Sequence, residues 1–218
     1  LEDVFDPDGI VPSRLHKLLV ATPFRYFVTT NYDNLLERAF MNTRNRHIER
    51  VSVDELTRID TLLGNSDFVI KLHGDLDKPE TIILGQRKYQ DLYQSSEYSA
   101  ILERIFLENS VLMVGYGLKD TDIVLALDRL ARVSPAQPPH FMLCPRGSRT
   151  LIEKKRLASD RNIHVIEYVD YFGFHNHIDT FLRGLNAGLN NIELLNRVPR
   201  SLGARIYVHY PAAVLLKV

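Results

Sequence analysis

The feature that most constrains this chain is a series of short apolar segments that alternate with segments of helical period. The apolar segments are rich in Val, Ile and Phe, and they lie at residues 24–30, 68–72, 111–114, 140–144 and 163–168. Strands that are buried on both faces have this composition. Helical spacing of apolar residues marks the segments 13–21, 34–41, 98–108, 120–132, 148–158 and 177–189. The alternation predicts an α/β fold in which a mostly parallel sheet carries helices on both faces.

Composition narrows the class of protein further. The 218 residues include 27 basic and 27 acidic side chains, and this balance argues against direct nucleic-acid binding, which needs a basic excess. The single cysteine excludes a disulfide framework and a four-cysteine zinc site, so we expect a cytoplasmic protein without a metal. No apolar run reaches the roughly 20 residues that span a bilayer, and no membrane partner is expected. The first residue is Leu1 rather than Met, which suggests a piece of a longer chain.

Two regions depart from the alternation. Residues 75–93 form a long excursion with a short apolar run, which we interpret as an inserted hairpin or as a lid over a site. Residues 202–218 form a new apolar segment that either starts another domain or adds a strand. We therefore divide the chain into a domain at residues 1–200 and a tail, or the start of a further segment, at 201–218.

Polar or glycine-containing segments follow three of the predicted strands. They are residues 29–33 (TTNYD), 73–75 (HGD) and 115–117 (GYG). Because parallel strands share one direction, all three segments fall on the carboxyl edge of the sheet, where open α/β sheets bind ligands. The sequence therefore predicts a ligand site at this edge.

The residue types in these segments suit the oxygen atoms of a ribose, a phosphate or a water. Asn31 offers both a donor and an acceptor, and Asp33 offers a negative charge or an acceptor. Imidazole groups titrate near neutrality, so His73 can accept a proton from a hydroxyl or a water. Glycine lets backbone approach a ligand, and the N–H groups of the turn at 115–117 can meet ribose or phosphate oxygens.

Each assignment has a structural alternative. Asn31 and Asp33 could cap the helix that begins near residue 34, and His73 could be a buried, hydrogen-bonded histidine. Tyr116 could stack on a base, although packing against the next helix is favoured. The two aspartates in D-T-D at residues 120–122 favour helix capping and weaken affinity for a phosphate. We therefore interpret the turn before them as a ribose contact.

Together the three segments resemble the motifs of the sirtuin (SIR2) superfamily. Residues 29–33 look like its T-x-N-x-D motif, and residues 71–74 (KLHG) look like its H-G motif. Residues 115–117 stand where the family has its G-T/Y-S turn. The resemblance covers roughly residues 14–185 and is closer to the SIR2-like domains of bacterial antiphage systems than to protein deacetylases. It implies a Rossmann-like fold that binds NAD⁺ and cleaves the bond between nicotinamide and ribose, with water as the acceptor.

The resemblance also implies roles for individual residues and partners for the protein. Asn31 and His73 would be the catalytic pair, and the contacts with the substrate NAD⁺ would come from Thr30, Asp33, Gly74, Gly115, Tyr116 and Gly117. The protein would be an NADase of antiviral defence that works as a homo-oligomer or beside other domains of a longer chain. A separate sensor protein or a phage-derived activator would be a further partner. The alternative function is a catalytically inactive module of this fold that binds NAD⁺, ADP-ribose or another protein.

The sequence departs from the family pattern in two ways. It cannot build the four-cysteine zinc module of the deacetylases, which disfavours lysine deacetylation. The family's opening G-A-G-x-S turn, which wraps the NAD⁺ phosphates, has no counterpart before Phe24, so we expect the first β–α unit to be missing. The sheet would then lack a central strand, and the strands that end at Thr30 and Val114 would expose their edges. We expect this chain alone to turn over NAD⁺ poorly.

Overall fold

The computed structural model describes residues 10–62, 67–118, 120–133, 138–170, 175, 177–196 and 212–216. In this part of the chain, seven strands form one sheet in the order β2-β3-β1-β7-β4-β5-β6, and every neighbouring pair is parallel. The strands are β1 (Tyr26–Thr29), β2 (Glu49–Ser52), β3 (Phe68–Lys71), β4 (Ser110–Val114), β5 (His140–Pro145), β6 (Ile163–Tyr168) and β7 (Ala212–Leu216).

Helices connect the strands. They are α2 (Arg14–Ala21), α3 (Leu35–Arg44), α4 (Ile59–Leu62), α5 (Gln86–Gln94), α6 (Ser96–Glu108), α7 (Thr121–Val133), α8 (Leu151–Arg161) and α9 (His177–Asn196). The described residues also form two short 3₁₀ helices, η1 (Val53–Arg58) and η2 (Pro79–Thr81). Among the described residues, none of the helices combines the length and the apolar character needed to cross a membrane.

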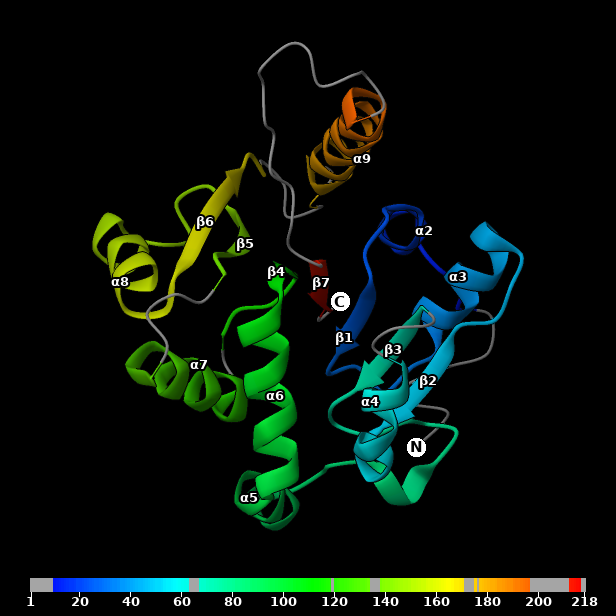
Figure 1. Ribbon diagram of the computed structural model, residues 1–218, viewed down its shortest axis with the longest axis vertical. Helices are drawn as coiled ribbons and strands as arrows, with labels where there is room; N and C mark the ends of the chain where they lie inside the picture. Colours follow the sequence, from blue (N-terminus) through cyan, green and yellow to red (C-terminus); the bar gives the residue numbers. More distant parts are fainter. Residues whose placement is uncertain are drawn as a thin grey trace.

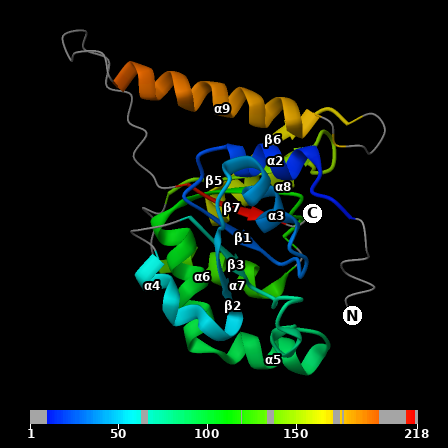
Figure 2. The same ribbon diagram turned by 90° about the vertical axis from the view of Figure 1, so that its right-hand side faces the viewer.

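The sheet separates two apolar layers, because successive side chains of a strand point to opposite faces. Tyr26 and Val28 of β1 join a cluster with α4, α6 and α7, whereas Phe27 between them joins a cluster with α2, α3 and α9. Figure 2 shows the two layers, with α9 and α2 on one side of the sheet and α4, α5 and α6 on the other. Strands covered on both faces explain the nearly continuous apolar runs of the sequence. The α/β fold with helices on both faces is therefore confirmed.

The predicted elements all appear, and the structure adds others. Each of the five predicted strands and six predicted helices is present with shifts at its ends. The sequence analysis missed β2, whose residues Glu49 and Arg50 are exposed or half-buried at the edge of the sheet. Its four residues E-R-V-S contain one apolar side chain, so no apolar run marks this strand.

The excursion at residues 75–93 contains no hairpin among the described residues. An isolated antiparallel bridge joins Asp75 to Lys78, and it is followed by η2 and by α5. The apolar run of this segment is buried without forming a strand, since Ile82 and Ile83 have 2% and 9% of their surfaces exposed. The hairpin alternative is therefore wrong, and the segment packs as a short 3₁₀ helix and an α-helix.

The centre of the sheet differs most from the expectation. The prediction that the strands ending at Thr30 and Val114 have open edges is wrong, because β7 lies between β1 and β4 (Figure 1). Its backbone pairs with β1 from Tyr26 to Thr29 and with β4 from Ser110 to Val114. The apolar run A-A-V-L-L in the tail has the length of a strand, and it supplies the missing ladder hydrogen bonds. Of the predicted tail segment at 201–218, the remaining residues lie outside the described part.

Candidate functional site

The register of the sheet aligns the segments that the sequence analysis singled out. Thr29 of β1 is paired with Lys71 of β3 on one side and with Leu216 of β7 on the other, and Leu216 is paired with Val114 of β4. These four residues form one row across the sheet. Asn31 and His73 each follow this row by two residues, on neighbouring strands about 4.8 Å apart. The turn after β4 follows the same row two strand spacings, or about 10 Å, from β1.

The loop after β1 is ordered by its own hydrogen bonds. The Asn31 N–H donates to Thr29 Oγ1 (3.0 Å), and the Leu35 N–H donates to Asp33 Oδ1 (3.0 Å). Asp33 thus binds an amide of the first turn of α3, as the capping alternative predicted. Asn31 lies half-buried at the end of the strand, and within the described part of the chain the buried Thr30 Oγ1 has no hydrogen-bond partner. Since buried polar atoms are normally paired, Thr30 is suited to a ligand.

A buried lysine ties this loop to β3. Lys71 Nζ donates to the backbone oxygens of Tyr32 (3.1 Å) and Asp33 (2.7 Å), and it forms ion pairs with Asp75 and Glu37, each at 3.2 Å. The Lys71 side chain is fully buried. Burial raises the pKa of Glu37, although the neighbouring Lys71 opposes this shift. The sequence analysis included this lysine in the motif at residues 71–74 but gave it no role, although a cation in the apolar run F-V-I-K-L is a signal.

Position 74 requires glycine because the backbone of residues 81–82 packs directly against it. Its φ is +102°, and a Cβ at this position would lie 2.4 Å from the Thr81 carbonyl oxygen and 2.6 Å from Ile82 Cα. The Ile83 N–H donates to the His73 carbonyl oxygen (2.8 Å), which holds the two segments together. The close approach at Gly74 is therefore made by residues 81–82, and it fixes the backbone on which His73 stands.

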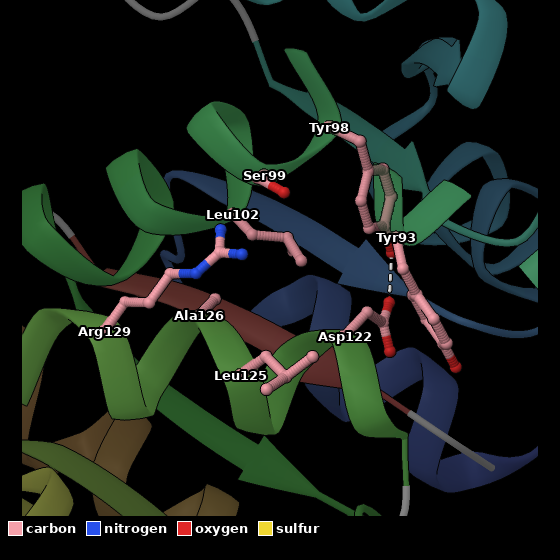
Figure 3. A pocket seen from close by; sticks show the side chains of 8 residues that line it. All are labelled: Tyr93, Tyr98, Ser99, Leu102, Asp122, Leu125, Ala126 and Arg129. Carbon is pink, nitrogen blue, oxygen red and sulfur yellow. Dashed lines mark hydrogen bonds between the residues drawn. The ribbon is translucent and has the colours of Figure 1, made fainter. Parts of the chain in front are cut away.

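The His73 side chain is 2% exposed and is held between two helices. Its Nε2 lies 3.4 Å from Asp122 Oδ2 of α7, and its Nδ1 lies 3.5 Å from the Tyr89 hydroxyl of α5. The Tyr98 hydroxyl of α6 donates to the same Asp122 oxygen, as Figure 3 shows. Burial raises the pKa of Asp122, but the hydrogen bonds from His73 and Tyr98 outweigh burial and leave this pKa below its usual range.

Asp122 lies in a position that the sequence analysis did not foresee. It was interpreted as a helix cap, yet the residue is only 5% exposed and its carboxylate faces inward from the start of α7. It lines a small cavity between α6 and α7, of about 10 Å³, with Tyr93 and Tyr98 beside it (Figure 3). The sequence carries no signal for this role, because both aspartates of D-T-D occur where caps are common.

A hydrogen bond from the loop between β5 and α8 holds the turn after β4 in place. Gly115 has φ +67°, and the Gly117 carbonyl oxygen accepts a hydrogen bond from Arg149 Nη2 (2.7 Å). Tyr116 is 3% exposed, in agreement with the packing alternative rather than with an open stacking surface. Burial raises the pKa of Tyr116, and the nearby Asp120 carboxylate raises it further. Gly115 and Gly117 are exposed at the carboxyl edge, where their backbone can meet a ligand.

Metal ligands do not gather in the part of the chain that the structure describes. No group of three or more His, Cys, Asp or Glu side chains there could hold a metal ion. The cysteine, Cys144, is buried and free at the end of β5.

A parallel sheet with helices on both faces, and with polar loops at the carboxyl edge around its centre, defines a Rossmann-like α/β domain. Residues 25–166 match the family model of the SIR2-like domain, and the chain belongs to the SIR2-like family. The family expected from the three motifs is therefore confirmed.

Curated relatives are similar to the same part of the chain. The NAD(+) hydrolase ThsA of Acinetobacter baumannii (strain 532279) is 26% identical over 132 residues, which cover 59% of this chain and 27% of that protein. The defense-associated sirtuin 2 of Bacillus subtilis is 29% identical over 132 residues, 59% of this chain and 13% of the relative. The NAD(+) hydrolase ThsA of Enterococcus faecium is 25% identical over 137 residues, which cover 60% of this chain and 28% of that protein. The chain thus spans less than a third of the length of these relatives.

Proposed function

We propose that this domain is an NAD⁺ glycohydrolase, which cleaves NAD⁺ into nicotinamide and ADP-ribose, and that it acts as the effector of a bacterial antiphage system. Membership of the SIR2-like family and the names of its relatives support the proposal. The observation that carries it is the register of β1 and β3, which sets Asn31 and His73 beyond the same row of neighbouring strands.

The proposed reaction needs few groups. The bond between the ribose C1′ and the nicotinamide nitrogen breaks, and nicotinamide leaves as a neutral molecule, so no acid is required. The sugar develops oxocarbenium character, which nearby polar groups stabilise. A water oxygen bonds to C1′, and its proton passes to His73. The Asn31 amide, with one donor and one acceptor group, orients the ribose or the water.

The remaining contacts with NAD⁺ fall into two groups in this proposal. Thr30 and the turn at residues 115–117 contact the ribose directly, since they present a buried hydroxyl without a partner and an exposed glycine backbone. Asp33 and Gly74 act through the positions of their loops, because Asp33 binds an amide of α3 and Gly74 packs against residues 81–82. Substitution of Thr30 is therefore expected to change the Michaelis constant for NAD⁺.

The test is to incubate the purified chain with NAD⁺ and to follow nicotinamide and ADP-ribose. Asn31→Ala and His73→Ala should each lower kcat by about 10²–10⁴-fold, the scale of removing a general base or its partner. The matched control is His47→Ala, since His47 is exposed and precedes β2 at the opposite, amino edge of the sheet. NAD⁺ binding without product would instead support the alternative of an inactive binding module.

The role in defence needs a separate test in cells. Phage infection of cells that express the complete protein should deplete NAD⁺ with the native sequence and leave it unchanged with Asn31→Ala. Depletion that persists in the variant cells would contradict the proposal that this site is the effector.

A further inference from the structure

The two ring nitrogens of His73 face different functional groups, a carboxylate and a phenol hydroxyl. Nε2 faces the Asp122 carboxylate at 3.4 Å, and Nδ1 faces the Tyr89 hydroxyl at 3.5 Å. The rings of His73 and Tyr89 meet edge to face, with centroids 5.3 Å apart and an interplanar angle of 88°. Since His73 and Asp122 are 2% and 5% exposed, water competes little for these contacts.

The partners of Asp122 fix which nitrogen carries the hydrogen. Asp122 Oδ2 accepts a hydrogen bond from the Tyr98 hydroxyl and also faces His73 Nε2. Burial raises the pKa of Asp122, but its polar contacts outweigh burial and leave the pKa below its usual range, so the carboxylate is ionised at neutral pH. An ionised carboxylate can only accept, and therefore Nε2 must donate. In a neutral imidazole the lone pair is then on Nδ1.

We propose that Asp122, supported by Tyr98, is a positioning residue that holds His73 in the Nε2–H tautomer, so that Nδ1 is the atom that accepts the proton during cleavage of NAD⁺. This inference rests on the proposed function. In the reaction the attacking water forms a bond to the ribose C1′ and gives its proton to Nδ1. The resulting imidazolium carries a hydrogen on each nitrogen, and the Asp122 carboxylate stabilises its charge.

The position of Tyr89 adds a requirement. Its hydroxyl lies 3.5 Å from Nδ1 and donates to this atom in the Nε2–H tautomer, so it must give way to the water, or pass the proton on, when NAD⁺ is bound. Burial raises the pKa of Tyr89, and the nearby Tyr32 raises it further, so this hydroxyl keeps its proton at neutral pH. The titratable groups around the pair come from the loop after β1, from α5 and α6, and from the segment between β4 and α7. They are Tyr32, Tyr89, Tyr93, Tyr98, Tyr116 and Asp120.

The first arm of the test does not depend on activity. Long-range ¹H–¹⁵N NMR spectra report the tautomer of each histidine, and the His73 signals are assigned by their loss in His73→Gln. Above neutral pH the native chain should show the Nε2–H form, and Asp122→Ala should populate both forms. An Nδ1–H form in the native chain, or an unchanged tautomer in Asp122→Ala, overturns the inference.

The second arm measures turnover of NAD⁺ by the native chain and its variants. Asp122→Ala should lower kcat by about 10²–10³-fold with little change in KM, because the carboxylate acts through His73 and not on the substrate. Asp122→Asn keeps the shape of the side chain and should also lower kcat, since the amide no longer compensates the charge of the imidazolium. The control on the same helix is Asp128→Asn, which removes a charge that faces Arg161 at the surface.

The outcomes separate this inference from the proposed function. A native chain that releases nicotinamide, together with an Asp122→Ala variant of unchanged kcat, overturns the inference and leaves the function standing. A native chain that releases none overturns the function, and the tautomer spectra still decide whether Asp122 holds His73. If Asp122→Ala does not fold, Asp122→Asn and Tyr98→Phe provide both readouts.

Discussion

Replacement of Gly74 by alanine tests how the loop that carries His73 is built. The added Cβ would meet the Thr81 carbonyl oxygen at 2.4 Å and Ile82 Cα at 2.6 Å, and both are backbone atoms that no side-chain rotation can move. Residues 81–82 must therefore shift away. The shift endangers two hydrogen bonds, from the Ile83 N–H to the His73 carbonyl oxygen (2.8 Å) and from the Asp75 N–H to Thr81 Oγ1 (3.0 Å).

The expected cost is the sum of two terms. A non-glycine residue with positive φ costs about 1–2 kcal/mol, and each lost hydrogen bond adds about 1 kcal/mol. Gly74→Ala should therefore lower the free energy of unfolding by about 3–4 kcal/mol. Gly85→Ala is the matched control, because Gly85 has φ +81° but open space around its Cβ position. It should cost only the backbone term, about 1–3 kcal/mol, because its φ of 81° and ψ of 154° lie in a region used almost only by glycine.

Urea denaturation of the native chain and the two variants, followed by circular dichroism, gives the three free energies. Gly74→Ala is also expected to lower NAD⁺ turnover more than Gly85→Ala, because His73 stands on the displaced backbone. Equal costs for the two substitutions would refute the reasoning, since backbone strain alone would then account for both.

Two further predictions concern buried charge. Lys71→Met should destabilise the fold by about 3–5 kcal/mol, because it leaves the buried Glu37 carboxylate without the lysine that pairs with it and leaves Asp75 with Arg50 alone. Urea denaturation at pH 7 measures this cost, and a value below about 1 kcal/mol would contradict the prediction. Burial lowers the pKa of His140 to about 4, below the 6.5 of an exposed histidine. Below pH 6.5 the unfolded chain therefore binds a proton at His140 that the folded chain does not bind. The free energy of unfolding is unaffected by His140 above pH 6.5 and falls as the pH drops towards 4. The loss amounts to about 3 kcal/mol. His140→Gln should remove this part of the pH dependence between pH 7 and 4, and an unchanged slope would show that other groups cause it.

Much of the architecture could be predicted because burial on both faces leaves a direct trace in the sequence. The strands around Phe27 and Val69 are apolar at every position or nearly so, and this pattern has few explanations other than a covered parallel sheet. The candidate site followed from the same argument, since parallel strands must end on one edge. Residues beyond that edge could be named without knowing the order of the strands.

What could not be predicted depends on contacts between distant segments. The role of Asp122 arises from side chains that approach it from the loop after β3 and from α6, and its position at the start of a helix fits a cap equally well. Lys71 acts through the carbonyl oxygens of a loop about 40 residues earlier in the chain, which no local pattern reveals. Gly74 was recognised as a point of close approach, but what approaches it is decided by the path of residues 81–82.

The central position of β7 has a consequence for how the domain assembles during synthesis. Strands β2, β3 and β1 form one half of the sheet and β4, β5 and β6 form the other, and within the described residues only β7 pairs with both halves. About 100 residues separate the end of β4 from β7, which corresponds to roughly 5–20 s of translation. During that interval β5 and β6 are completed, and the inner edges of β1 and β4 stay open to other strands until β7 emerges. The joining of the halves, and with it the alignment of Asn31 and His73 with the turn at residues 115–117, is therefore the last step in the assembly of this sheet.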